Sequence, residues 1–203
     1  MAIKKINLAV LISGSGSNLQ ALIDACAAPD YPAKISVAIS NKPGAFGLQR
    51  AEKAGIPVET VDHTKYANRG DFENVLHNVL GKYNVDLICL AGFMRILTPD
   101  FIAKWEGKII NTHPALLPKH GGKGMYGEHV HKAVLAAGDK ESGVTIHYVI
   151  PDVDRGEIIL QKRVKVEPGD THEALAKRVL AEEHKAYAEA VRMIAEKNLK
   201  KTA

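Results

Sequence analysis

The feature that most constrains this chain is an alternation of apolar runs and helix-like segments through its first half. Runs rich in valine, isoleucine and leucine predict strands at residues 6–12, 35–39, 58–61, 85–91 and 108–110. Between them, the spacing of apolar residues predicts helices at 18–27, 44–55, 71–83 and 99–105. Strands that alternate with helices in this way form a parallel sheet covered on both faces, with right-handed crossovers. We therefore expect an α/β, Rossmann-like domain of three layers.

The second half breaks this alternation. Residues 127–137 predict a helix, and residues 143–150 and 157–166 predict two strands joined by a short loop. Strands connected so closely usually pair antiparallel, so we expect antiparallel strands to be added to the sheet. A long helix is predicted from residue 171 to about residue 197.

The length of the chain and its lack of a long linker predict a single domain. At 203 residues it has enough chain to bury a substantial core. We expect one unit over residues 1–203, in which a phosphate-binding, nucleotide-type half (1–100) and a catalytic half (101–203) are not independent.

Composition and charge argue against several classes of protein. A net charge of +4 with scattered basic residues, and only 5% aromatic residues, does not fit a nucleic-acid-binding surface, although it could favour an anionic substrate. Two cysteines do not make a disulfide framework. We see no secretory signal pattern and no apolar run long enough to span a membrane. We expect a soluble, cytoplasmic protein that acts on small molecules, without nucleic acid or membrane, as a monomer or homodimer.

The tetrapeptide Asn111-Thr112-His113-Pro114 follows the strand at 108–110, where that strand is expected to end. In extended chain, alternate side chains share a face, so Asn111 and His113 should project together. Ligands of open α/β sheets bind at the carboxyl ends of the strands. An amide and an imidazole placed there would donate hydrogen bonds to a developing oxyanion.

A glycine- and serine-rich turn, Ser13-Gly14-Ser15-Gly16-Ser17-Asn18, links the first strand to the first helix. Such a turn lets backbone N–H groups at a helix N-terminus approach a phosphate. A nicotinamide enzyme would want a third glycine at Leu19 and an acidic residue at the end of the second strand, where Ser40-Asn41 stands. A monophosphate therefore fits better than a dinucleotide or ATP.

Asp154 and the histidines leave alternatives open. Asp154 lies in a tight loop with Gly156, where it could bond its own turn or could orient His113 and keep it charged. The nine histidines invite a metal site around His129 and His131, which His120 and His147 could join, but neither a cysteine cluster nor an H-E-x-x-H helix accompanies them. We expect no metal.

Taken together, the motifs resemble the glycinamide ribonucleotide formyltransferases, a folate-dependent family of purine biosynthesis. The motifs that carry the resemblance are ISGSGSNL (12–19), LAGFMRIL (90–97), NTHPALLP (111–118) and DVDRG (152–156). The similarity runs through nearly the whole chain in order and spacing. The chain departs from the family in a longer glycine-rich loop at 119–128, and in Leu180, where some relatives have a polar residue.

The resemblance implies an enzyme, a co-substrate and a set of site residues. The co-substrate would be 10-formyltetrahydrofolate, and the second half of the chain would bind it. Catalysis would fall to Asn111, His113 and Asp154, and contacts with glycinamide ribonucleotide to Gly16, Ser17, Asn18 and Glu183. The implied folate contacts are Arg69, Met94, Arg95, Ile96, Leu97, Ile150, Pro151, Asp152 and Val153.

The expected reaction is direct transfer of the formyl group to the amine of glycinamide ribonucleotide, without a covalent enzyme intermediate. A formyltetrahydrofolate hydrolase or a methionyl-tRNA formyltransferase would carry an extra domain before or after this region. The first predicted strand and the last predicted helix lie near the two ends of the sequence, so we expect neither appendage. A non-catalytic module that binds a phosphometabolite is the alternative from another class.

Overall fold

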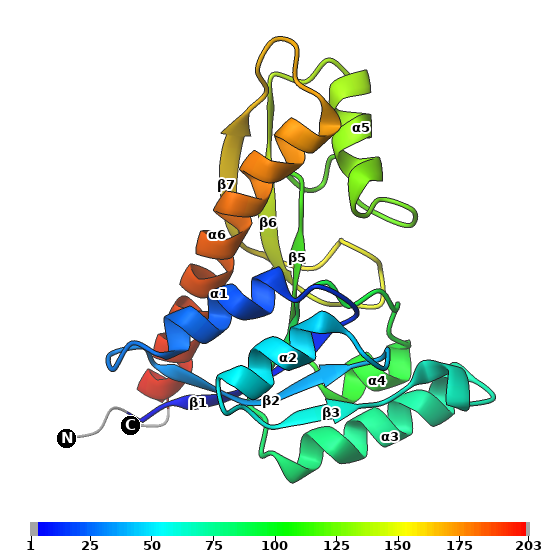
Figure 1. Cartoon of the computed structure of the whole chain (residues 1–203), viewed down its shortest axis with the longest axis vertical. Helices are drawn as coiled ribbons and strands as arrows, with labels where there is room; N and C mark the ends of the chain where they lie inside the picture. The colour runs from blue at the N-terminus through cyan, green and yellow to red at the C-terminus, as the bar shows by residue number, and fades with distance from the viewer. Residues whose placement is uncertain (1–3, 202–203) are drawn as a thin grey trace.

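The computed structural model describes residues 4–201, which contain one seven-stranded mixed sheet with the order β3-β2-β1-β4-β5-β6-β7 (Figure 1). The first five strands pair in parallel, and β6 and β7 pair antiparallel. The predicted α/β class, with antiparallel strands added in the second half, is confirmed. The strands are β1 (Ile6–Ile12), β2 (Ala33–Ser40), β3 (Val58–Thr60), β4 (Leu87–Leu90), β5 (Ile109–His113), β6 (Glu141–Tyr148) and β7 (Ile158–Lys165).

Helices cover both faces of the sheet, and the side chains of β1 show why. Leu8, Val10 and Ile12 pack into one core with α1 (Ser17–Cys26), α2 (Phe46–Lys53) and α6 (His172–Lys201). The alternate residues Ala9 and Leu11 pack into a second core with α3 (Arg69–Lys82) and α4 (Pro99–Lys104). Strand alternation thus divides one apolar run between two cores. A short 3₁₀ helix, η1 (His63–Lys65), precedes α3.

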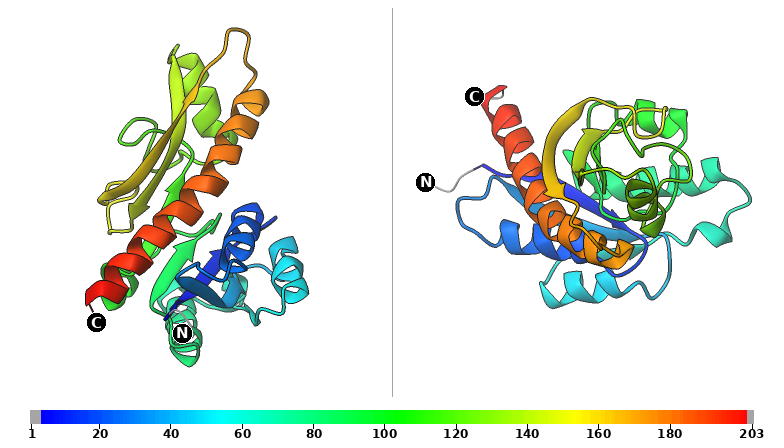
Figure 2. Two further views of the ribbon diagram at one scale, coloured as in Figure 1. Left: turned by 90° about the vertical axis from the view of Figure 1, so that its left-hand side faces the viewer. Right: turned by 90° about the horizontal axis from the view of Figure 1, so that it is seen from above.

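The last helix joins the two halves of the sequence. In Figure 2, α6 crosses the molecule diagonally, and it packs against α1 from the first half and against α5 (Glu128–Ala136) and β6 from the second. Tyr187 is fully buried, and its hydroxyl donates to the carbonyl of Leu90 at 3.0 Å. The helix is therefore fixed at the ends of the central strands, and it continues past the predicted end near residue 197.

The strand order changes direction at β1 and β4, and the loops that follow these strands lead away in opposite directions. Such a switch point is where open α/β sheets bind ligands. The loop after β1 is joined to the loop after β4, because Ser13 N–H donates to Gly92 O at 3.0 Å and Met94 N–H donates to Ser13 Oγ at 2.7 Å. The fold thus places the glycine-rich loop, residues 92–97 and the end of β5 along one edge of the sheet.

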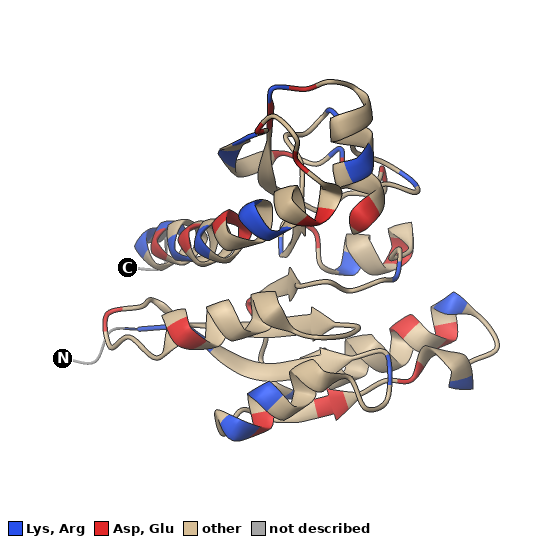
Figure 3. Ribbon diagram, turned by 45° about the horizontal axis from the view of Figure 1, so that its top comes forward, with Lys and Arg blue, Asp and Glu red and all other residues tan. Residues whose placement is uncertain are grey.

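Charged residues of both signs are interspersed along the chain. Figure 3 shows basic and acidic residues alternating along the helix that leads to the C-terminus. Among residues 4–201, no helix combines the length and apolar character that crossing a membrane requires.

Candidate active site

Strand β5 carries Asn111 and His113 within its paired region rather than beyond it. The prediction that the strand ends at residue 110 is wrong, because β5 continues to His113 through its pairing with β6. Asn111 lies opposite His147 and His113 lies opposite Thr145. Asn111 and His113 therefore share one face of the strand, while Thr112 faces the other way. Pairing with β6 also buries the His113 ring, which is 3% exposed.

Asp154 faces the two histidines from the loop between β6 and β7. Its Oδ2 lies 3.5 Å from His113 Nδ1, and its Oδ1 lies 3.6 Å from His147 Nε2. The Asp154 backbone has a φ of 56°, a left-handed conformation that is uncommon outside glycine. Gly156 lets the loop close, because a Cβ at that position would lie 1.8 Å from the carbonyl oxygen of Tyr148.

The carboxylate of Asp154 accepts a hydrogen bond from a backbone N–H that is distant in the sequence. It accepts from the N–H of Gly122 at 2.9 Å, across 32 residues. The alternative role, a turn aspartate that serves its own loop, therefore does not describe this geometry. The side chain is 8% exposed and lies against His113 and His147.

Burial and charge act on this cluster in opposite directions. Burial lowers the pKa of the His113 imidazole; Asp154 and the carbonyl of His120 offset only part of this, so the pKa stays below its ordinary value. Burial alone would raise the pKa of Asp154, but its contact with His147 and the hydrogen bond from the Gly122 N–H outweigh burial and lower that pKa. Asp154 therefore stays ionised. It favours a charged His113 without fully offsetting the burial of the ring.

Hydrogen bonds orient the polar side chains on this face of β5. His113 Nε2 donates to the carbonyl oxygen of His120 at 2.8 Å, because a carbonyl only accepts. By the same argument His147 Nδ1 donates to the carbonyl of Tyr148 at 2.9 Å. The other ring nitrogen of His147, Nε2, lies 3.3 Å from the amide nitrogen of Asn111. His147 Nε2 thus lies between the amide of Asn111 and the carboxylate of Asp154.

The glycine-rich loop after β1 leads directly into α1. Gly16 occupies the N-cap position with a left-handed φ of 69°. The backbone of Gly16 packs closely against α2, since a Cβ at this position would come within 2.6 Å of Gly47 Cα. Within residues 4–201, no side chain caps α1 and no acidic residue lies in its first turn. The N–H groups of this turn and the helix dipole suit a phosphate.

Glu183 of α6 lies between the glycine-rich loop and β5. Its Oε1 accepts from Asn18 Nδ2 at 3.0 Å and from Thr112 Oγ1 at 2.8 Å. Burial raises the pKa of the Glu183 carboxyl, and these two hydrogen bonds lower it by less. Asn18 binds Glu183 through Nδ2, and its backbone N–H lies in the first turn of α1.

The residues implied as folate contacts differ in how exposed they are. Met94, Ile96 and Ile150 are large apolar side chains that are exposed by 54%, 47% and 39%. Leu97 differs, because it is 5% exposed and its side chain packs in the core with α3 and α4. The remaining residues of the set are Arg69, Pro151 and Asp152, which are exposed, and Arg95 and Val153, which are half-buried.

Several residues at the site had no assigned role in the sequence. The loop at 119–128 departs from the family, and the resemblance assigns it no contacts, yet His120 and Gly122 contact His113 and Asp154. Thr112 binds Glu183, and its place on the opposite face of β5 follows from strand alternation. Across the described chain, no three side chains of His, Cys, Asp and Glu are grouped to hold a metal ion.

The chain matches known proteins in both its sequence and its fold. A protein-family model described as formyl transferase matches residues 6–191. The chain is 42% identical over 193 residues to the phosphoribosylglycinamide formyltransferase of Haemophilus influenzae, covering 95% of this chain and 89% of that protein. A crystal structure of glycinamide ribonucleotide transformylase 1 from Symbiobacterium toebii has a TM-score of 0.89 at 43% identity, covering 95% of this chain and 88% of that one.

A longer relative matches over part of its length. The trifunctional purine biosynthetic protein adenosine-3 of Gallus gallus is 48% identical over 191 residues, which are 94% of this chain and 18% of that protein. The chain thus spans less than a fifth of the length of that relative. Since the family model covers nearly all of the chain, and the bacterial relative is matched over nearly all of its own length, this protein belongs to the formyl transferase family.

Proposed function

We infer that this protein is a phosphoribosylglycinamide formyltransferase, which transfers a formyl group from 10-formyltetrahydrofolate to the amine of glycinamide ribonucleotide in purine biosynthesis. One observation carries the inference. Asn111, His113 and Asp154 meet at the carboxyl end of β5, beside a helix N-terminus suited to phosphate. This arrangement occurs in a chain 42% identical to a phosphoribosylglycinamide formyltransferase over almost its whole length.

The amine of the substrate attacks the formyl carbon, and a tetrahedral oxyanion forms. A new C–N bond joins the formyl carbon to the amine, and the bond from that carbon to the folate nitrogen then breaks. The amine gives up a proton, and the folate nitrogen takes one up. Asn111 donates to the oxyanion through the amide hydrogen that does not face His147. Loss of one such donor typically costs about 10²–10³ in turnover.

His113 supplies the second hydrogen bond. Its Nε2–H already has a short partner in the His120 carbonyl, at 2.8 Å, whereas Nδ1 lies 3.5 Å from Asp154. The contact with Asp154 is longer than a good hydrogen bond, so Nδ1 carries the N–H that is left to bind the oxyanion. Negative charge on the oxyanion favours a protonated His113 and so opposes the effect of burial. Asp154 orients the ring and assists removal of the amine proton.

The two substrates bind on either side of this cluster. The phosphate of glycinamide ribonucleotide lies against the backbone of Gly16, Ser17 and Asn18, and Glu183 faces its amine end. The exposed apolar side chains Met94, Ile96 and Ile150 offer a surface for a flat heterocycle. Arg95 has a buried Nε that lacks a partner among residues 4–201, and Arg69 is exposed. Both suit the carboxylates of a folate.

One assay separates this function from its alternatives. The protein is mixed with 10-formyltetrahydrofolate, with and without glycinamide ribonucleotide, and formation of tetrahydrofolate is followed by absorbance. We expect product only when both substrates are present. Product without the ribonucleotide would indicate a hydrolase, and binding of both substrates without product would indicate a binding module. His113→Ala serves as the matched inactive control.

A further inference from the structure

Three residues of the loop after β5 lie directly against the His113–Asp154 pair. His120 contributes its carbonyl oxygen to His113 Nε2 at 2.8 Å, and Gly122 contributes its N–H to Asp154 Oδ2 at 2.9 Å. Between them, Gly121 packs so closely that a Cβ would lie 3.3 Å from Asp154 Cβ. The geometry of the pair therefore depends on where residues 120–122 are held.

Backbone hydrogen bonds flank this stretch, from Lys119 N–H to Leu116 O at 3.2 Å and from Met125 N–H to Gly122 O at 3.0 Å, but they do not include His120. His120 has a φ of 53°, a left-handed conformation that costs energy for a residue with a side chain and persists only when its surroundings impose it. Gly122 and Gly124 follow with φ values of 99° and 89°. Glycines at such positions permit the turn but leave the chain conformationally free. Something outside the backbone has to fix His120.

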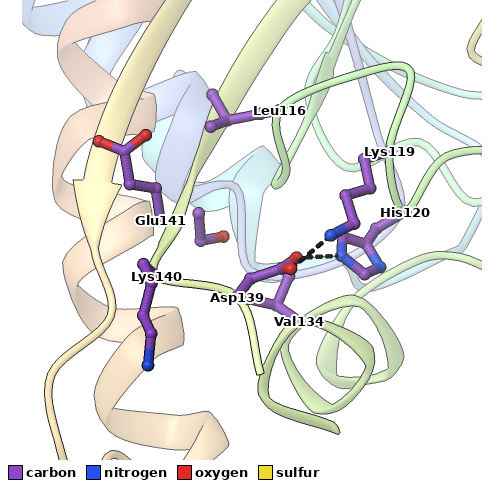
Figure 4. Close-up of a pocket in the computed structure, with 8 residues that line it drawn as sticks. Leu116, Lys119, His120, Val134, Asp139, Lys140 and Glu141 are labelled. Carbon is purple, nitrogen blue, oxygen red and sulfur yellow. Dashed lines mark hydrogen bonds and ion pairs between the residues drawn. The ribbon is translucent and has the colours of Figure 1, made fainter. Parts of the chain in front are cut away.

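Asp139, in the turn between α5 and β6, is the side chain that fixes it. Figure 4 shows Lys119 and His120 both directed at the Asp139 carboxylate. Asp139 Oδ2 lies 2.7 Å from His120 Nε2, and Oδ1 contacts Lys119 Nζ. The His120 and Asp139 side chains are 12% and 15% exposed, so solvent screens their attraction only in part. Two consecutive side chains of the loop are thus bound to one carboxylate.

We propose that Asp139 is a positioning residue for the formyl transfer, acting through His120, whose carbonyl oxygen it holds against Nε2 of His113. The proposal deepens the proposed function and rests on it. Because the carbonyl only accepts, Nε2 keeps its hydrogen in both charge states of the ring. The proton that His113 gains and loses is therefore carried by Nδ1, which faces Asp154. Asp139 in this way directs the mobile proton toward the reacting group.

Other charged and titratable groups also face this region, and none of them supplies the same constraint. His113 is surrounded by Asp154 in the loop after β6, His147 on β6, His131 on α5 and His120 itself. The groups that face Asp139 are Lys119 and His120. In the described chain, the partner of His113 Nε2 is the carbonyl of His120.

Steady-state kinetics of Asp139→Ala test the proposal first. We expect kcat to fall by about 10- to 100-fold, because a small displacement of a catalytic group has effects of that size. We expect the KM of each substrate to stay within about twofold, since Asp139 touches neither. Glu141→Ala is the matched control, because Glu141 lies two residues away and pairs with the exposed Arg163. A kcat for Asp139→Ala equal to that of the control would overturn the proposal.

Titration of His113 by NMR tests the same idea without substrates. In the wild-type protein, the ¹⁵N shift should show that Nε2 stays protonated while Nδ1 titrates. In Asp139→Ala, loss of the carbonyl acceptor removes an interaction that favours the charged ring, so His113 should lose its proton at a lower pH. An unchanged titration and unchanged solvent exchange of the Nε2 hydrogen would contradict the role of Asp139. Since the wild-type assay decides the function by itself, the two failures are distinguishable.

A double-mutant cycle shows whether Asp139 acts through His120. His120→Phe removes the imidazole that Asp139 binds and keeps the backbone carbonyl. If the two side chains act in series, the double variant should lose no more activity than the more damaged single variant. If the fold losses in kcat of the two single variants multiplied in the double variant, Asp139 would not act through His120. Asp139→Asn keeps an oxygen that accepts from His120, so it should retain more activity and a more nearly normal His113 titration than Asp139→Ala. Thermal unfolding of each variant checks that it folds.

Discussion

Two ends of parallel strands build this site in different ways. At the end of β1, the site consists of backbone groups. One continuous loop leads to the N-terminus of α1, and Gly16, which has no side chain, occupies the N-cap position. At the end of β5, it is side chains: Asn111 and His113 meet His147 from β6, Asp154 from the next loop and the carbonyl of His120. The first suits a fixed anionic group, and the second suits a proton that moves.

The difference also appears in the electrostatics. Backbone N–H groups and a helix dipole present the same partial charge at every pH. The β5 cluster contains ionisable groups whose pKa values depend on their burial and on one another: those of His113 and Asp154 both lie below their ordinary values. Damage to the β1 end should therefore weaken binding of one substrate, whereas damage to the β5 end should slow the chemical step.

The largest effect is expected from Asp154→Asn. The asparagine side chain carries no negative charge beside His113 and cannot take up a proton. We therefore expect kcat to fall by about 10²–10⁴-fold, the usual size of a general acid–base contribution. Initial rates at saturating substrates measure it. Glu157→Gln, an exposed carboxylate just beyond the same loop, is the control. Near-normal turnover of Asp154→Asn would remove Asp154 from the mechanism.

Asn111→Ala should follow in size. It deletes a donor to the oxyanion and leaves His147 Nε2 without its amide neighbour. We expect kcat to fall by about 10²–10³-fold, with the KM for glycinamide ribonucleotide changed much less. Single-turnover rates separate this from slower product release. If the loss appeared mainly in KM, Asn111 would belong to binding and the contrast between the two strand ends would fail.

Ser17→Asp probes the opposite end. A carboxylate in the first turn of α1 interacts favourably with the positive end of the helix dipole, so the variant should be no less stable than the wild-type protein. The same charge should repel the substrate phosphate and raise the KM for glycinamide ribonucleotide by about tenfold or more, with the folate KM unchanged. Ser17→Ala, which adds no charge, is the matched variant. Equal increases in both KM values would place the phosphate elsewhere.

The smallest expected effect is on stability, through Glu183. Its carboxyl pKa is raised by burial in the folded protein. A raised pKa means that its contribution to folding is fully present below the unfolded pKa and is lost as pH rises through the folded pKa. Glu183→Gln keeps an oxygen for Asn18 and Thr112 but cannot ionise, so relative to wild type its free energy of unfolding should rise between about pH 5 and about pH 8. Urea unfolding at the two pH values measures this, and a constant difference would show that Glu183 does not titrate there.

The fold followed from the sequence in most respects because its signals are local. Apolar periodicity identified the strands and helices, and alternation of strand and helix indicated the parallel sheet. The end of β5 was predicted too early, at residue 110, because Asn111-Thr112-His113 is polar. Pairing with β6 continues the strand to His113, and such pairing between distant segments leaves no local pattern. The long helix α6 continues to Lys201, and Leu199 near its end packs against the core that contains residues of β1 and α1.

The site followed only in part. Glycines and serines after a strand indicated the phosphate loop, and N-x-H indicated two side chains on one face. The role of Asp154 stayed open between a turn and a partner for His113. Its position beside His113 and His147 depends on the β6–β7 hairpin, on Gly156 and on the Gly122 N–H. Nothing in the sequence indicates that His120 and Asp139 act on His113, because their effect passes through a backbone carbonyl.

The sequence by itself determined the elements, the glycine-rich loop after β1 and the presence of an amide–imidazole pair, since each depends on residues adjacent in the chain. The tertiary structure alone decided which groups surround that pair: Asp154 and His147 on one side, and the carbonyl of His120, anchored by Asp139, on the other. The physical reason is that a pKa and a proton position depend on burial and on neighbours a few ångströms away. Only the packed fold brings those neighbours together.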